Sequence, residues 1–389
     1  MVIYYTIFIA LYLCCFFYKA PAKTQLSVMK IWVLIFTLFG GLRWNTGSDW
    51  DAYLFLFNDL DWSNFYDYSK YGEKSLQKIE PLFAFMNVII KTVFQKYYWF
   101  NIIECFVIHF AYYKFSKYHL PKCPILCFVF LEIICIAYFP VRQSLAASVL
   151  FLGLRYIKER KLVKYLLFVF VAFYIHKMSI VALPLYWLQN IHLKDRYVIA
   201  VFLSFIVIGK ILQDYFVIFV FLLGGELGEV AQIYTENQTV ENTGLPIITL
   251  IVNGMFLFIY LYIRRKFNLR QDDWYNQNLN MYLMFLGTLV VFANGMNDLT
   301  RLIIVFLPGH CLLFSSIAAY SLKGDSRCIQ YSGRIALPTN DRVISVFKLF
   351  LGFLFFTYCA YRIPQCFSDY FFKYVCIPYR TIFDFPSVI

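Results

Sequence analysis

Charged residues are scarce in this sequence: Asp, Glu, Lys and Arg make up 15% of its 389 residues. A soluble globular domain carries about a quarter charged and close to half apolar residues, whereas 61% of this chain is hydrophobic. The shortage of charge excludes an ordinary soluble enzyme, a disordered chain and a nucleic-acid-binding module. The net charge is +12, which we interpret as basic side chains in the cytoplasmic loops of a membrane protein rather than as a nucleic-acid surface.

Several common catalytic motifs are also missing. The sequence contains no P-loop, no GxSxG, no HExxH and no dinucleotide-binding glycine pattern. The eleven cysteines form no CxxC pair, and most lie inside apolar runs, which excludes a disulfide framework and a zinc site. We therefore predict chemistry that needs no ATP, no metal and no other cofactor.

Long apolar runs are abundant. A transmembrane helix needs about 20 apolar residues, and such runs recur along the chain without a soluble domain between them. The sequence predicts an all-α, polytopic integral membrane helix bundle, a single domain over 1–389 with roughly 10–12 transmembrane helices. The candidate spans are 1–18, 29–42, 99–115, 123–139, 141–157, 163–188, 197–223, 246–263, 279–293, 299–321 and 343–361, with 81–94 as a shorter one.

Loop charge predicts the orientation, because Lys and Arg concentrate in cytoplasmic loops. Basic loops around residues 19–30, 114–122, 158–164, 264–270 and 323–342 are expected inside. The loops 43–80, with seven acids against four bases, and 224–245, with four acids and no base, are expected outside, as is the tail 362–389. The number of membrane crossings fits these loop sides if 81–94 is an interfacial or half helix and if 163–188 breaks at His176. A break at His176 would then line a cavity.

Two arginines are expected at the outer starts of helices. Arg142 follows Pro140, and proline favours the first turn of a helix, where unpaired N–H groups and a guanidinium together attract an anion such as a phosphate. Arg301 falls in the first turn of 299–321. The alternatives are an arginine that reaches to the interface for Arg142, and an ion pair with Asp298 for Arg301.

Two further groups are candidates. The segment 43–53 combines Arg43, Asp49 and Tyr53 with two tryptophans, a mixture suited to sugars or to a membrane interface. Glu80 precedes Pro81 at a predicted helix start, where its carboxylate either takes part in the reaction or caps the helix. His176 lies in an apolar run and is either a proton carrier or a packing residue.

These residues in this order resemble the EpsG/Wzy-type polysaccharide polymerases of bacterial inner membranes. The matching pieces are Gly41-Leu42-Arg43 with Gly47-Ser48-Asp49 and Tyr53, Glu80-Pro81-Leu82-Phe83, Val141-Arg142-Gln143-Ser144-Leu145-Ala146, Phe173-Tyr174-Ile175-His176-Lys177-Met178-Ser179, Tyr234 and Arg301. The resemblance implies a glycosyltransferase-C-like bundle that joins undecaprenyl-diphosphate-linked oligosaccharide repeat units at the periplasmic face. A flippase and a chain-length regulator of the same pathway are the implied partners.

The chemistry of that reaction assigns the candidate roles. Arginines at helix starts stabilise the charge that develops on a diphosphate leaving group, and a general base removes the proton of the acceptor hydroxyl. The candidates for the base are His176, Asp49 and Glu80. We favour His176, with Asp49 as the second choice. The predicted binding residues are Arg43, Arg142, Gln143, Arg301, Tyr53 and Tyr234. A lipid-linked oligosaccharide flippase or other transporter, and a membrane O-acyltransferase, are the alternative functions.

Overall fold

A computed structural model of the chain describes residues 1–47, 50–65, 79–135, 142–223, 247–292, 302–329, 342–368, 376–377 and 379–385. The described residues form two compact units, one that runs up to Tyr186 and resumes at Cys311, and one over Trp187–His310. The described part of the chain is helical, with one isolated β-bridge and no strand. This confirms the predicted all-α, polytopic class; the single domain over 1–389 stays a prediction.

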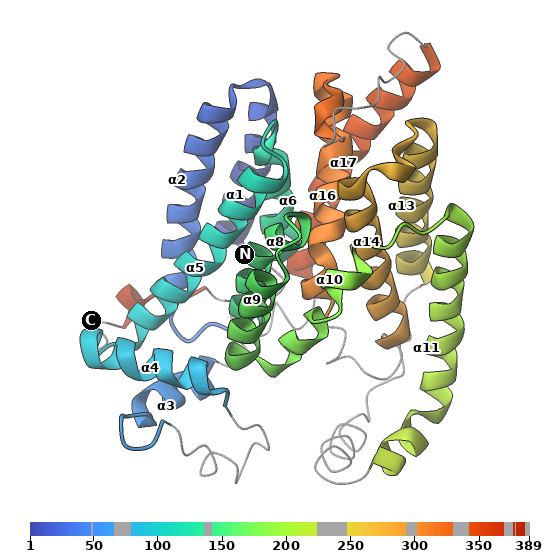
Figure 1. The fold of residues 1–389 in the computed structure, drawn as a ribbon. Helices are drawn as coiled ribbons and strands as arrows, with labels where there is room; N and C mark the ends of the chain where they lie inside the picture. The colour runs from blue at the N-terminus through green and yellow to red at the C-terminus, as the bar shows by residue number, and fades with distance from the viewer. Residues whose placement is uncertain are drawn as a thin grey trace. The chain divides into compact units, whose positions relative to one another are not determined.

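The first unit contains most of the helices (Figure 1). In chain order they are α1 (Val2–Leu13), η1 (Cys14–Lys19), α2 (Ala22–Gly41), α3 (Trp50–Asp59), α4 (Pro81–Phe94), α5 (Tyr97–His119), α6 (Pro124–Cys135), α7 (Arg142–Gly153), α8 (Arg155–Lys158), α9 (Leu162–Ile175), η3 (Lys177–Ala182), η5 (Ser326–Cys328), α17 (Arg342–Ser368) and η6 (Ile382–Asp384).

The second unit contains α11 (Asp195–Leu223), α13 (Ile247–Lys266), η4 (Leu269–Gln271) and α14 (Asp273–Phe292). Helices α10 (Leu185–Leu188) and α16 (Ile303–Lys323) each begin in one unit and end in the other. Among the described residues, four helices are long and apolar enough to cross a membrane, namely Val2–Lys19, Ala22–Gly41, Ile248–Lys266 and Ile303–Lys323. The chain is therefore a multi-pass membrane protein.

Helix boundaries follow the predictions at the points that matter for function. Helix α4 covers 81–94 as predicted, with Glu80 as its N-cap residue and Pro81 in its first turn. The predicted break at His176 is confirmed: α9 ends at Ile175, His176 is extended (φ −155°, ψ 116°), and the 3₁₀ helix η3 follows. The lost backbone hydrogen bonds at such a break need other partners.

The predicted first residues of two helices were wrong, because polar residues near the start of each helix lower its local hydropathy. Helix α2 begins at Ala22 rather than 29 and contains Gln25, whose side chain is fully buried and donates to the carbonyl oxygens of Tyr18 and Ala20. Helix α14 begins at Asp273 rather than 279. Its first turns contain amide side chains that are buried inside the protein. A buried amide with its hydrogen bonds made is compatible with a membrane helix.

Helix α5 has 23 residues, which at 1.5 Å per residue span about 34 Å. Helix α2 crosses it closely. A Cβ atom on Gly41 would lie 2.6 Å from the Cα of Ile102, and one on Gly40 would lie 2.7 Å from the Sγ of Cys105. Glycine is therefore required where these two backbones meet.

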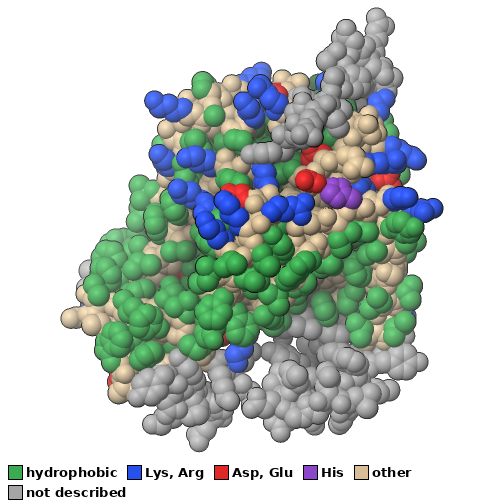
Figure 2. All heavy atoms as spheres, viewed as in Figure 1, with side chains coloured by type: hydrophobic (Ala, Val, Ile, Leu, Met, Phe, Trp, Pro, Cys, Tyr) green, Lys and Arg blue, Asp and Glu red, His purple; other side chains and the backbone are tan. Residues whose placement is uncertain are grey.

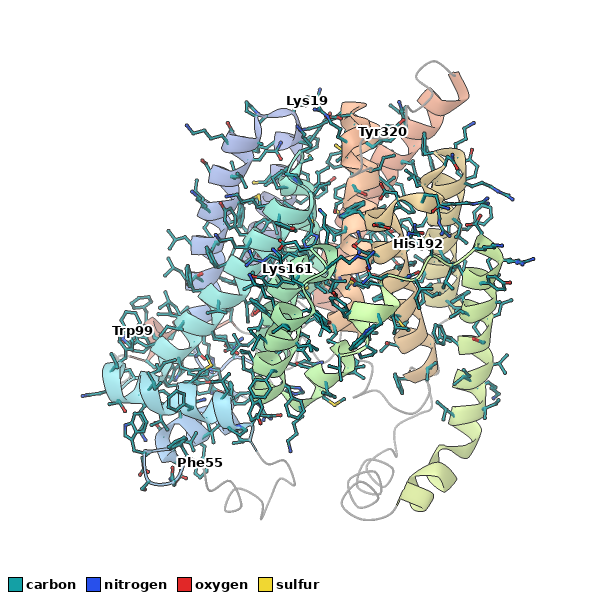
Figure 3. The ribbon with its side chains drawn as sticks, viewed as in Figure 1. Lys19, Phe55, Trp99, Lys161, His192 and Tyr320 are labelled. Atoms are coloured by element: carbon teal, nitrogen blue, oxygen red, sulfur yellow. The ribbon has the colours of Figure 1, made fainter. Side chains whose placement is uncertain are left out.

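Four of the basic loops meet at one end of the first unit. Lys323 donates to the carbonyl of Lys122, Tyr118 donates to Glu159, and the backbone N–H of Ile125 donates to Gln25 beside the first loop. In Figure 3, Lys19 and Tyr320 lie at that end, whereas Trp99 and Phe55 lie at the opposite one. Figure 2 shows hydrophobic side chains gathered on one part of the surface, with most of the Lys and Arg side chains to one side of them. The contacts show that these loops share one end of the unit; their cytoplasmic side stays a prediction.

Candidate functional site

Three predicted residues converge at the end of the first unit that lies away from the basic loops. Arg142 Nη1 donates to Glu80 Oε2 at 2.7 Å, and Arg142 Nε donates to Tyr53 Oη at 3.1 Å. The Arg142 and Glu80 side chains are only 12% and 6% exposed. The guanidinium carbon also lies 5.7 Å from the ring centres of both Tyr53 and Phe83. Arg142 is thus held by a charge pair, a hydroxyl and two aromatic faces.

Three helices position this cluster, which we call the Arg142 cluster (Tyr53, Glu80, Phe83 and Arg142). Arg142 is the first residue of α7, as its position after Pro140 predicts. Glu80 and Phe83 come from the start of α4, and Tyr53 comes from the first turn of α3. Lys91 of α4 donates to the backbone carbonyls of Asn58 and Leu60, which fixes the end of α3 against α4.

Glu80 does not cap its helix, so that alternative is wrong. It occupies the N-cap position, but its side chain makes no cap hydrogen bond. The carboxylate points instead to Arg142 and, through Oε1, accepts a hydrogen bond of 3.0 Å from the backbone N–H of Lys177. The missing backbone partner at the break between α9 and η3 is therefore supplied by Glu80.

His176 lies directly beside that contact. It is half-buried and is the residue that separates α9 from η3, while Lys177, the next residue, is bonded to Glu80. Helix α9 also packs against α4 and α7, the two helices that supply Glu80 and Arg142. The structure therefore brings His176, Glu80, Tyr53 and Arg142 to one region, although their sequence positions span more than a hundred residues.

The cluster has the chemistry of an anion site. A guanidinium has five N–H donors, and the Nη2 group of Arg142 has no hydrogen-bond partner within the described ranges. Its location at the N-terminus of α7 adds the positive end of the helix dipole. Glu80, by contrast, has both carboxylate oxygens occupied, one by the Arg142 guanidinium and one by the backbone N–H of Lys177. Within the described residues no group of His, Cys, Asp and Glu side chains is arranged to hold a metal ion.

Arg43 lies in a different environment from the one expected of a ligand-binding arginine. It is 5% exposed, forms the isolated bridge with Thr381, and interacts electrostatically with Glu104 of α5, which is itself 4% exposed. The neighbouring Thr46 is 1% exposed. In this structure Arg43 is enclosed by protein rather than open to a substrate.

The remaining predicted residues are less fully placed. Gln143 follows Arg142 in α7 and is half-buried. Asp49, Tyr234 and Arg301 lie outside the described residues, so the predicted convergence of Arg142 and Arg301 stays a prediction.

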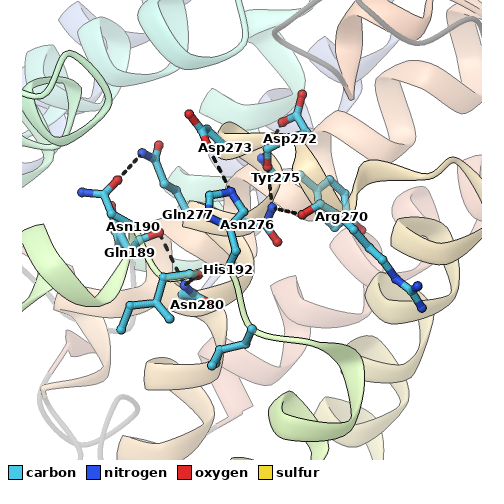
Figure 4. Close-up of polar contacts among 12 residues, drawn as sticks. Gln189, Asn190, His192, Arg270, Asp272, Asp273, Tyr275, Asn276, Gln277 and Asn280 are labelled. Atoms are coloured by element: carbon cyan, nitrogen blue, oxygen red, sulfur yellow. Dashed lines mark hydrogen bonds and ion pairs between the residues drawn. The ribbon is translucent and has the colours of Figure 1, made fainter.

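Sequence reasoning missed a buried polar network in the second unit (Figure 4). Arg264, 2% exposed, donates to Asp195, to the carbonyl of Leu193 and to Asn276 at 3.0, 2.7 and 2.6 Å. Asn280 donates to the carbonyls of Leu188 and Ile191. The signal was present as a run of amides at the start of α14, namely Asn276, Gln277, Asn278 and Asn280. The network joins α13 and α14 to the segment before α11.

The sequence model of the EpsG family matches residues 26–381 of the 389. No curated protein and no solved structure matches the chain.

Proposed function

The chain belongs to the EpsG family, and on that premise we propose that it is a polysaccharide polymerase of the bacterial inner membrane. It joins undecaprenyl-diphosphate-linked oligosaccharide repeat units at the periplasmic face. Family membership supports polysaccharide polymerisation in general; the substrate, the side of the membrane and the residue roles are our proposal.

One observation carries the proposal: Arg142 is fixed by Glu80 and Tyr53, with N–H donors to spare, beside the helix break at His176. This cluster contacts the first half of α5, through Phe83 and Phe100, while the basic loops gather around its last turn. Since α5 is about as long as a bilayer is thick, the predicted cytoplasmic location of these loops supports a periplasmic location for the cluster.

The reaction assigns a task to each group. The acceptor hydroxyl oxygen forms a bond to the anomeric carbon of the donor, the bond from that carbon to the diphosphate oxygen breaks, and polyprenyl diphosphate leaves. Arg142, with Arg301, Gln143 and Tyr234 as further binding residues, stabilises the charge on the leaving diphosphate. His176 accepts the hydroxyl proton, with Asp49 as the alternative base, and Glu80 holds Arg142 in place.

Deletion in the source organism tests the proposal. We expect its surface polysaccharide, separated by gel electrophoresis, to lose the ladder of long chains and to retain a single repeat unit. Restoration of the ladder by the wild-type chain, but not by an Arg142→Ala variant present at equal level, links the effect to the cluster. Loss of every repeat unit contradicts a polymerase and indicates a flippase.

A further inference from the structure

The segment 379–385 lies against the residues that follow α2, although more than 330 residues separate them in sequence. The backbone N–H of Trp44 donates to the carbonyl of Arg380, and that of Ile382 donates to the carbonyl of Leu42, both at 2.9 Å. Arg43 and Thr381 form the antiparallel bridge between the two stretches. The short chain 42–46 is therefore paired to the 379–385 segment by its backbone.

Side chains fix the 379–385 segment in turn. The Tyr379 ring stacks on Phe39 of α2, with centroids 4.6 Å apart, and meets the edge of Tyr4 of α1 at 5.7 Å. The Tyr379 hydroxyl donates to the carbonyl of Phe39. Thr381 and Asp384 form a capping box at the start of η6. Burial raises the pKa of the Tyr379 hydroxyl, which keeps it a hydrogen-bond donor.

The pairing encloses Arg43 and Thr46 and directs them inward. Arg43 interacts electrostatically with Glu104 of α5, and an arginine enclosed near the membrane requires such an acidic partner. Arg43 thus lies where the end of α2 is bridged to the 379–385 segment, with Glu104 of α5 as its acidic partner.

A series of contacts leads from this point to the Arg142 cluster. The Trp44 ring meets the edge of Trp50 at 4.5 Å, and Trp50 is the first residue of α3 and packs on Tyr97 at 5.6 Å. Tyr53 lies one turn further along α3, where it accepts the hydrogen bond from Arg142 Nε. The position of α3, and so of Tyr53, depends on the stretch 42–46.

We propose that the 379–385 segment is a positioning element of the polymerase, and that Arg43 is a positioning residue rather than a substrate ligand. By pairing with 42–46, the segment fixes α3 and through Tyr53 sets the orientation of the Arg142 guanidinium. The proposal deepens the proposed function and rests on it for its effect on activity.

Activity tests the coupling through a double-mutant cycle. Tyr379→Ala removes the stacking on Phe39 and the hydroxyl donor, and we expect it to lower kcat about tenfold in polymerisation of purified lipid-linked repeats. In a Tyr53→Phe background the same change should cost less than about twofold, because both changes act through one contact. Phe383→Ala, at a side chain 66% exposed in the same segment, is the control and keeps full activity.

A role in stability alone predicts the opposite pattern. The two substitutions would then multiply in their effects, and this result overturns the proposal, as does full activity of Tyr379→Ala. If Tyr379→Ala does not fold, Tyr379→Phe retains the ring and removes only the hydroxyl, and it takes the same place in the cycle.

A second measurement does not depend on polymerisation. Thr46→Cys, in a chain whose half-buried Cys14 is replaced by serine, carries no other cysteine that is not buried. We expect its thiol to resist a water-soluble maleimide in the intact chain and to react at least tenfold faster after Tyr379→Ala. Equal reaction rates in both chains reject the positioning role even if the polymerase activity is real, whereas protection without polymerisation by the wild-type chain rejects only the proposed function.

Discussion

Replacement of Tyr53 by phenylalanine removes one atom from the Arg142 cluster and leaves the aromatic face in place. The lost atom accepts the hydrogen bond from Arg142 Nε at 3.1 Å, while the ring remains 5.7 Å from the guanidinium carbon. A hydrogen bond to a charged group contributes about 1.5–3 kcal/mol. Because this one is longer than the strongest charge-assisted bonds, we take the lower value, about 1.5 kcal/mol, which corresponds to about a tenfold loss of kcat.

Arg142→Lys completes the test. Lysine keeps the positive charge near Glu80 but has no second donor group in the fixed geometry of the guanidinium fork. We expect a loss of about 1.5–3 kcal/mol, or about 10- to 150-fold in kcat. In this background Tyr53→Phe should have less than about a twofold effect, since the hydrogen bond that it removes no longer exists.

The assay is polymerisation in proteoliposomes that contain the purified chain and lipid-linked repeat units from cells that lack it, with the ladder measured on gels. Tyr197→Phe is the matched control, because it removes an Arg196 to Tyr197 hydrogen bond of 3.0 Å at an exposed site. It should leave activity unchanged. If the losses from Tyr53→Phe and Arg142→Lys multiply, the two side chains act independently and our description of the cluster is refuted.

Further predictions concern the base and the packing. His176→Ala should abolish polymerisation, and His176→Gln should stay at least about a hundredfold below wild type, since glutamine makes hydrogen bonds but accepts no proton; near-normal activity of the glutamine variant would transfer the base role to a carboxylate. Arg264→Met should lower the free energy of unfolding by about 3–5 kcal/mol because it leaves buried partners unpaired, whereas exposed Arg265→Met should change it by less than about 0.5 kcal/mol; thermal melting in detergent measures both. Gly41→Ala should lower the melting temperature sharply, since its Cβ would meet the backbone of Ile102 at 2.6 Å, whereas Gly254→Ala, with open space around it, should not.

Local sequence signals predicted the parts of this fold that depend on neighbouring residues. Apolar runs indicated the helices, Glu80-Pro81 indicated the start of α4, and His176 with Lys177 indicated the end of α9. Each of these features follows from residues within a turn or two, through helix propensity, first-turn proline and the cost of polar groups in an apolar run.

Contacts between distant residues were not predictable in the same way. Glu80 and Arg142 are 62 positions apart, and nothing near Glu80 distinguishes a cap from an ion pair. The burial of Arg43 depends on the 379–385 segment, which carries no pattern that points to residue 43. Composition suggested that an arginine among aromatics and acids binds a ligand; the structure shows that the same residues equally suit an enclosed charge whose partners come from elsewhere in the chain.

The role of Glu80 follows from what its two oxygens contact. Oε2 accepts from Arg142 and Oε1 accepts from the N–H of Lys177, so one carboxylate joins the helix start that carries Arg142 to the helix break that carries His176. Both oxygens of Glu80 are therefore occupied by partners within the protein, and its side chain is only 6% exposed. The contact at the helix break is made by the backbone N–H of Lys177, the residue that follows His176. In the proposed reaction Glu80 therefore orients Arg142, and His176, which lies beside the contact that Glu80 makes, is the base that we propose.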